Sequence, residues 1–160
     1  MWSAPGSVVA GRRGGVTFVA AAADDGATDA WPDPTINIVS VGGTILTLDA
    51  GEYDAESRLP SCVSPATVSF AATGFSVYQG GIWQTPGGTS AAAPQWASLF
   101  AIANQGRAIA HKGSLDGATQ TLASLGVFSD DDFHDIADAN PATGRGSPFA
   151  DRVIADLLGV

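Results

Sequence analysis

Apolar residues recur along this chain in one long helical pattern and in several short runs. Trp96, Leu99, Phe100 and Ala103 follow the spacing of one helix face, which predicts a buried helix over 91–104. Short apolar runs bounded by Gly, Pro and Ser predict strands. The strands are expected at 16–22, 38–47 and 69–78, with further helices at 114–125 and 148–158 and loops at 29–34 and 60–65. Short strands beside a hydrophobic helix indicate an α/β layered domain.

The start of the 91–104 helix holds a candidate nucleophile. Gly88 and Thr89 lead directly into Ser90, so the Ser90 hydroxyl is predicted at a helix N-terminus. Free backbone N–H groups and the positive end of the helix dipole would stabilise an oxyanion that develops beside it. Pro94 is expected in the first turn, where its missing N–H costs nothing. The alternative is that Thr89 or Ser90 serves only as the helix N-cap.

A serine nucleophile needs a base within hydrogen-bond reach. His111 and His134 are the only histidines, and both follow Ser90 in the chain. A subtilisin-type order places the histidine before the serine, and Thr89-Ser90-Ala91-Ala92 is not the Gly-x-Ser-x-Gly elbow of an α/β-hydrolase. If Ser90 is catalytic, its base is therefore a carboxylate, and neither histidine is expected to be catalytic.

Several segments, in the same order along the chain, resemble the sedolisins, which are the serine-carboxyl peptidases. The segment around Ser90 resembles the family's nucleophile motif, and 15–27 resembles the strand that ends at its oxyanion aspartate, with Asp24 at the matching position. The tail resembles the end of the peptidase domain. The resembling segments are 15–27, 31–32, 37–44, 87–97, 105–107, 133–136 and 142–148.

This resemblance implies both a fold and an activity. The fold is a partial subtilisin-like layered α/β fold, with a mostly parallel sheet flanked by helices. Sedolisins use a Ser-Glu-Asp arrangement, so the resemblance makes Ser90 the nucleophile of a serine-type endopeptidase and Asp24 the residue that helps to hold the oxyanion. Its substrate would be a protein or peptide.

The catalytic Glu and its partner Asp lie upstream of the oxyanion aspartate in the family, but residues 1–23 contain neither Asp nor Glu. Residues 1–160 are therefore interpreted as an incomplete sedolisin-like peptidase domain, the C-terminal half, with an N-terminal half as its missing partner. The chain alone is expected to be inactive. Two alternatives remain open: a non-catalytic remnant or pseudoenzyme that acts at most as a binding module, and an unrelated structural domain.

Two further segments depart from the family pattern. The chain is short between Glu56 and Thr67, where the family has a Gly-rich substrate-binding loop, so part of the cleft is expected to be missing. Asp135 and Ile136 match the first pair of the family's calcium ligands. The following loop is cut to 137–140, with Asn140 at the place of the last Asp. Because Ca²⁺ requires six to eight oxygen ligands, the shortened loop predicts weak binding or none, and the alternative is a solvated acidic turn.

Composition narrows the remaining possibilities. The chain has 160 residues and a net charge of −9, which fits one domain and argues against nucleic-acid binding. No apolar run reaches the roughly 18 residues of a membrane span, so no membrane partner is expected. The acidic triplet 130–132 is expected to be a solvated helix start or loop, and the single Cys62 excludes a disulfide framework within the chain.

Arg12 and Arg13 before an apolar run could be interpreted as a twin-arginine export signal. The family resemblance instead makes 16–22 an internal strand of the sheet. Extracellular localisation is expected only because secretion is the habit of the family.

Overall fold

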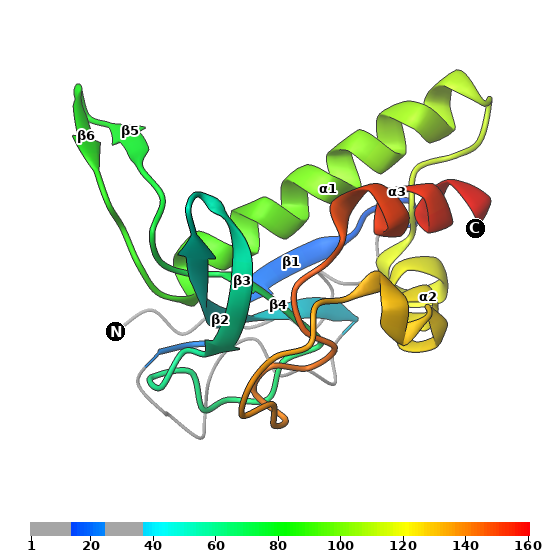
Figure 1. Ribbon diagram of the computed structural model, residues 1–160. Helices are drawn as coiled ribbons and strands as arrows, with labels where there is room; N and C mark the ends of the chain where they lie inside the picture. The colour runs from blue at the N-terminus through cyan, green and yellow to red at the C-terminus, as the bar shows by residue number, and fades with distance from the viewer. Residues whose placement is uncertain (1–13, 25–36) are drawn as a thin grey trace, which may run out of the picture.

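A four-stranded sheet forms the middle layer of the molecule, in a computed structural model that describes residues 14–24 and 37–160 (Figure 1). Its strands are β1 (Phe18–Ala21), β2 (Ile38–Asp49), β3 (Glu52–Arg58) and β4 (Val68–Ala71). β1 and β4 pair with β2 in parallel, whereas β3 returns from β2 as an antiparallel hairpin. The predicted α/β fold with a mostly parallel sheet is confirmed.

β2 organises the sheet because its 12 residues give each partner strand a stretch of its own. Residues 38–41 pair with β1, 41–44 with β4 and 44–49 with β3. Gly42 lies in the middle of this strand, where a Cβ atom would collide with the backbone oxygen of Ala142. The glycine therefore allows a later loop of the chain to pack directly on the sheet.

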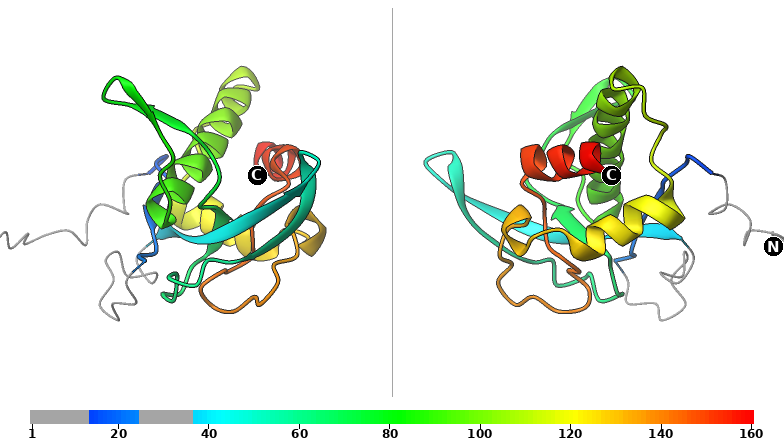
Figure 2. Two further views of the ribbon diagram at one scale, coloured as in Figure 1. Left: turned by 60° about the vertical axis from the view of Figure 1, so that its left-hand side comes forward. Right: turned by 90° about the vertical axis from the view of Figure 1, so that its right-hand side faces the viewer.

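Helices α1 (Thr89–Ile109) and α3 (Ala150–Gly159) lie together on one face of the sheet (Figures 1 and 2). α1 contacts β1, β2 and β4. Its predicted buried face is confirmed, because Trp96, Leu99, Phe100 and Ala103 are all buried. The indole N–H of Trp96 donates to the carbonyl of Ser69 at 2.7 Å, so the polar atom of this core side chain is paired.

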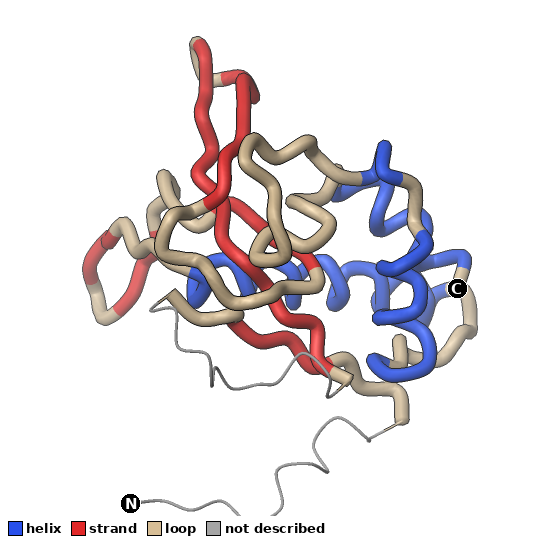
Figure 3. The backbone as a smooth tube through the Cα atoms, turned by 90° about the horizontal axis from the view of Figure 1, so that it is seen from below, coloured by secondary structure: helices blue, strands red, loops and turns tan. Residues whose placement is uncertain are grey.

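Loops cover the opposite face of the sheet, in front of the strands in Figure 3. The backbone of the loop segment before α3 forms hydrogen bonds with the β4 region. Ser69 N–H donates to the carbonyl of Gly146 at 2.9 Å, and Arg145 N–H donates to the carbonyl of Thr67 at 3.1 Å. Three short helical elements precede the segment. They are the π-helical turn η2 (Gly117–Thr121), helix α2 (Leu122–Val127) and the 3₁₀ turn η3 (Asp130–Asp132).

The predicted strand 69–78 is wrong as a single strand. β4 ends at Ala71, the chain turns at Gly74 with φ of 82°, and β5 (Val77–Gln79) begins a separate hairpin with β6 (Ile82–Gln84). A glycine with positive φ ends an extended run that the apolar pattern alone would continue. This hairpin stands away from the sheet near the start of α1 (Figures 1 and 2).

Three other expectations also need correction. Pro94 lies in the second turn of α1, not in the first, and its ring removes the N–H that would pair with the carbonyl of Ser90. Asp132 is buried at 7% exposure, so the acidic triplet is not simply solvated. The predicted helix 114–125 begins later, because the Asp116 carboxylate caps η2 by accepting the N–H of Thr119 at 2.9 Å.

The remaining elements agree with the expectations or lie outside the described residues. β1 confirms an internal strand within 16–22, and α3 corresponds to the helix expected at 148–158. Arg12, Arg13 and the loop expected at 29–34 lie outside the described residues. Among the described helices, none is both long and apolar enough to cross a membrane.

Candidate active site

Ser90 lies in the first turn of α1 with an exposed side chain. The helix is capped by Gly88, which has φ of 87° and no side chain, and no side-chain cap bond is made there. The interpretation of Thr89 or Ser90 as an N-cap is therefore not supported, because neither occupies the cap position. The hydroxyl of Ser90 is left at the helix N-terminus and open to a ligand.

Asp24 follows the carboxyl end of β1 and reaches the same helix start. Its carboxylate accepts the backbone N–H of Thr89, with N–O distances of 2.9 and 3.2 Å to the two oxygens. The topology explains this meeting, because β1 and β4 run parallel and the chain enters α1 after the carboxyl end of β4. The structure thus brings Asp24 and Ser90, far apart in sequence, to one edge of the sheet.

The contact between Asp24 and α1 depends on Gly88. A Cβ atom at Gly88 would lie 2.5 Å from Oδ2 of Asp24, which is too close for any side chain. The carboxylate sits against the N-terminal end of α1, where the helix dipole favours negative charge. Asp24 therefore acts as a cap supplied from another element, in addition to any chemical role.

Cys62 is the single cysteine near this region and is not activated. Its side chain is fully buried. Burial raises the pKa of the Cys62 thiol, the charge of Asp24 raises it further, and a hydrogen bond from the Gly43 backbone partly opposes both. The thiol is therefore kept protonated, which leaves Ser90 as the candidate nucleophile at this edge.

A groove of about 630 Å³ opens beside Ser90. Sequence reasoning missed it, because its far wall comes from the β5–β6 hairpin that was expected to continue β4. A signal for the hairpin was present: Gly80-Gly81 separates two short runs with Tyr and Trp, which is typical of a tight β-turn. The lining residues are Phe75, Val77, Gln79, Pro86, Gly87, Ser90, Ala91, Pro94, Gln95 and Ser98.

Neither histidine belongs to this groove. His111 follows the C-terminal end of α1, about 30 Å from Ser90 at the rise of an α-helix. The His134 ring lies between the rings of Tyr53 and Phe149, with centroid distances of 4.2 and 3.8 Å. Burial lowers the pKa of His134, which suits a packed neutral ring more than a base for Ser90.

Glu56 is a buried carboxylate that sequence reasoning did not single out. Its side-chain oxygens accept hydrogen bonds from the hydroxyls of Thr44 and Ser147. These bonds tie β3, β2 and the loop before α3 together, so Glu56 has a structural explanation. Its polar surroundings are not readable from the sequence, because the two hydroxyl donors come from distant segments.

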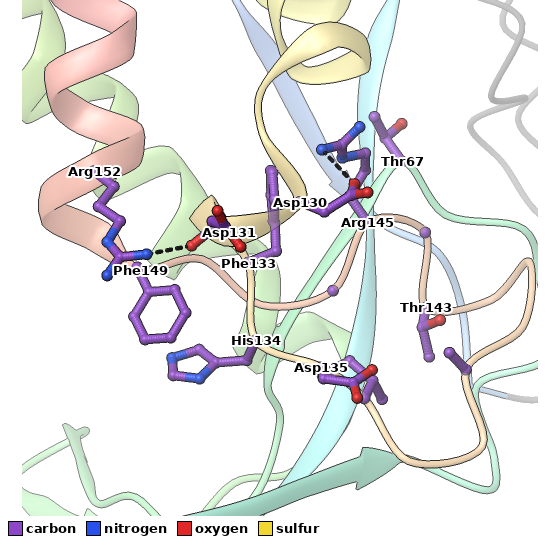
Figure 4. A pocket seen from close by; sticks show the side chains of 14 residues that line it. Thr67, Asp130, Asp131, Phe133, His134, Asp135, Thr143, Arg145, Phe149 and Arg152 are labelled. Carbon is purple, nitrogen blue, oxygen red and sulfur yellow. Dashed lines mark hydrogen bonds and ion pairs between the residues drawn. The ribbon is translucent and has the colours of Figure 1, made fainter.

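Asp135 and Ile136, the calcium ligands implied by the family resemblance, border a hollow of about 800 Å³, shown in Figure 4. Asp135 is exposed, the carbonyl of Ile136 accepts the N–H of Ala139, and Oδ1 of Asn140 accepts the N–H of Ala142 at 2.8 Å. Among the described residues, no cluster of three or more His, Cys, Asp or Glu could hold a metal. A Ca²⁺ ion at this loop would therefore need most of its six to eight ligands from carbonyl oxygens and water.

Comparison with solved structures defines the class of fold as subtilisin-like. The chain superposes on Pseudomonas sedolisin, a serine-carboxyl proteinase, with a TM-score of 0.66 and 22% identity over 88% of this chain and 55% of that one. It also superposes on fervidolysin from Fervidobacterium pennivorans, a keratinolytic enzyme related to subtilisin, with a TM-score of 0.61 and 15% identity. That match covers 91% of this chain and 23% of fervidolysin.

The sequence comparison agrees on the particular family that the chain resembles. The chain is 28% identical to kumamolisin from Bacillus sp. (strain MN-32) over 97% of its own length and 40% of kumamolisin. No family model matches the chain. The resemblance to the C-terminal half of a sedolisin-type catalytic domain is confirmed, and the chain spans only about half the length of these relatives or less.

The alignment with kumamolisin also shows where the two differ in length. It extends over 229 positions, whereas this chain has 160 residues, so kumamolisin contains additional segments that this chain lacks. Such gaps agree with the shortened loops noted in the sequence.

Proposed function

We propose that this chain is the nucleophile-bearing part of a serine-carboxyl peptidase domain. The observation that carries the proposal is the pair of contacts between the Asp24 carboxylate and Thr89 N–H, at 2.9 and 3.2 Å, directly beside the exposed Ser90. Asp24 and Ser90 match the oxyanion aspartate and the nucleophile of the sedolisins. Their meeting at a helix N-terminus supports assigning them those roles.

In the proposed reaction, Ser90 Oγ attacks the carbonyl carbon of a peptide bond, and the hydroxyl proton passes to a base. One oxygen of Asp24 stays on Thr89 N–H. The other oxygen, protonated during the reaction as the resemblance to the sedolisins implies, donates a hydrogen bond to the new oxyanion. The N-terminal end of α1 adds favourable electrostatic potential. The tetrahedral intermediate then collapses: the C–N bond breaks, and the amine leaves with the proton that the base returns to it. Water attacks the resulting acyl-enzyme, which releases the new carboxyl group and frees Ser90.

We assign the role of the base to a carboxylate that lies outside the described residues. Within them, Ser90 makes no side-chain hydrogen bond, and neither histidine lies in its groove. We therefore propose that the 160-residue chain needs an additional segment with a Glu/Asp pair for turnover, and that a complete domain acts on proteins or peptides outside the cell.

A second candidate is a non-catalytic binding module. The exposed Ser90 also favours this candidate, because a protein that has a groove beside a serine but no base binds a peptide without turning it over. The two candidates differ in whether Ser90 still forms a covalent adduct.

A peptide aldehyde labelled with ¹³C at the carbonyl tests the proposal without needing a base. Ser90 Oγ adds to the aldehyde carbon, and its proton moves to the aldehyde oxygen, which gives a hemiacetal. The amount of hemiacetal at equilibrium depends on the contacts of the oxyanion site. A base would change only how fast that equilibrium is reached. We expect the hemiacetal ¹³C signal with the unmodified chain, its loss in Ser90→Ala and its weakening in Asp24→Asn. Equal signals in all three proteins would overturn the assignment of the nucleophile.

A further inference from the structure

The groove beside Ser90 has two walls with different origins. One wall is the first turns of α1 with Pro94, Gln95 and Ser98, and the other is the β5 region with Phe75 and Val77. Its volume of about 630 Å³ lies within the range of sites that hold a small ligand or a few side chains. Ser90 borders the same groove, so a residue bound in it would lie close to the bond that Ser90 attacks.

The register of the β5–β6 hairpin sets which side chains face the groove. Val77 pairs with Gln84, Tyr78 with Trp83 and Gln79 with Ile82. Side chains alternate between the two faces of a strand, so Val77 and Gln79 point to the groove. Tyr78 and Trp83 contact each other on the opposite face, with ring centroids 5.3 Å apart.

The charge of the groove limits what it can bind. None of its lining residues carries an ionisable acidic or basic side chain, although the chain as a whole has a net charge of −9. A charged side chain placed there would lose hydration without gaining a partner of opposite charge. An uncharged apolar side chain would instead bury apolar surface against Phe75, Val77 and Pro94.

Gln95, on the α1 wall of this groove, offers a polar group suited to a peptide backbone. Its Nε2 donates to the carbonyls of Ala71 at 2.8 Å and Ala91 at 3.0 Å. Both amide hydrogens are therefore used, which leaves the carboxamide oxygen as the atom of Gln95 that can accept a peptide N–H.

We propose that the groove between β5 and α1 is a specificity subsite that selects polypeptides with a bulky, uncharged apolar residue next to the bond attacked by Ser90. The proposal rests on the peptidase function proposed above, and it names the substrate class of that site. Val77 is its specificity-determining residue, because it lies on the wall formed by the hairpin and is 36% exposed, so a substitution there is accommodated without repacking the core.

Binding of two uncleaved peptides tests this assignment. The peptides are acetyl-Ala-Ala-Phe-Ala-Ala-amide and the same peptide with Asp in place of Phe, titrated by calorimetry into the unmodified 160-residue chain at pH 6. We expect the Phe peptide to bind at least about tenfold more tightly, because burying an unpaired charge costs more than the roughly 1.4 kcal/mol that a tenfold difference represents. Equal affinities, or no binding of either peptide, would overturn the proposal.

Two lysine substitutions on the same strand provide a matched pair. Val77→Lys places a cation in the groove, so it should reduce the preference for Phe over Asp by about tenfold or invert it. Tyr78→Lys places the same charge on the opposite face of β5 and should leave the preference unchanged. Because improved binding of the Asp peptide to Val77→Lys is a gain, misfolding would not produce it. A similar loss of preference in both variants would contradict the groove assignment.

The aldehyde experiment separates this inference from the proposed function. If the Ser90 hemiacetal forms but the unmodified chain shows no peptide preference, the subsite is wrong and the nucleophile assignment stands. If the preference is present without a hemiacetal, the groove binds apolar peptides and the peptidase assignment falls.

Discussion

At the scale of single residues, Gly88 determines whether the two candidate catalytic side chains can meet. It adopts φ of 87° and ψ of 171°, a backbone region that is essentially restricted to glycine. A side chain at this position would also press on the Asp24 carboxylate. The requirement for glycine at this point is therefore both conformational and steric.

We predict that Gly88→Ala lowers the free energy of unfolding by about 1–3 kcal/mol from backbone strain, and further because Asp24 is displaced. Hemiacetal formation at Ser90 should weaken in the same variant. Gly81→Ala is the control, because Gly81 has φ of 86° but a methyl group added there would meet no atom within 4 Å. Urea denaturation measures the free energy of unfolding of both variants. An equal loss of stability in the two variants, with unchanged hemiacetal formation, would argue against the role of Gly88.

At the scale of elements, two carboxyl groups meet where η3 contacts α3. Asp132 in η3 is buried at 7% exposure, and Asp156 lies on α3. Burial, then the charge of Asp132, then a hydrogen bond with it, all raise the pKa of Asp156 above its ordinary value. Because the folded chain takes up this proton more readily than the unfolded chain, the contribution to stability is present at low pH and is lost as the pH rises through the raised pKa.

We predict that Asp132→Asn increases stability at pH 7 relative to the unmodified chain and leaves it nearly unchanged at pH 3.5. The substitution removes the repulsion that appears once Asp156 ionises. Asp151→Asn is the control: Asp151 is an exposed residue of the first turn of the same helix, and losing its favourable interaction with the helix dipole should slightly lower stability. Urea unfolding at both pH values measures the effect, and a loss of stability at pH 7 in Asp132→Asn would refute the repulsion.

At the scale of the whole molecule, the proposed function takes its nucleophile, its oxyanion group and its groove from the described residues and its base from outside them. It spans 40% of kumamolisin and 55% of Pseudomonas sedolisin. Loss of the base from a serine protease costs several orders of magnitude in turnover even when the oxyanion site survives. The proposed peptidase function therefore depends on more than these 160 residues.

We predict that the purified chain shows no appreciable turnover of a denatured protein substrate from pH 3 to pH 7. Ser90→Ala serves as the control for contaminating peptidases. Turnover that Ser90→Ala abolishes would show that another residue of this chain acts as the base. Asp25 and Asp29 are the candidates for that role, and both lie outside the described residues.

Local patterns and family motifs determined much of this protein from its sequence alone. The spacing of Trp96, Leu99, Phe100 and Ala103 was enough to place the buried face of α1, because helix periodicity depends only on neighbouring residues. The motifs around Asp24 and Ser90 indicated the resemblance to the sedolisins, because each motif is a short run of neighbouring residues that can be recognised without the structure.

Tertiary structure alone decided the features that depend on distant residues. It buried Asp132 beside α3, and it made the Asp24 carboxylate the cap of a helix that begins 65 residues later. It also formed the apolar groove, whose walls come from the β5–β6 hairpin and from α1. Burial and hydrogen-bond partners at these positions are set by which segments the sheet brings together, and a local sequence pattern carries no information about segments that are distant along the chain.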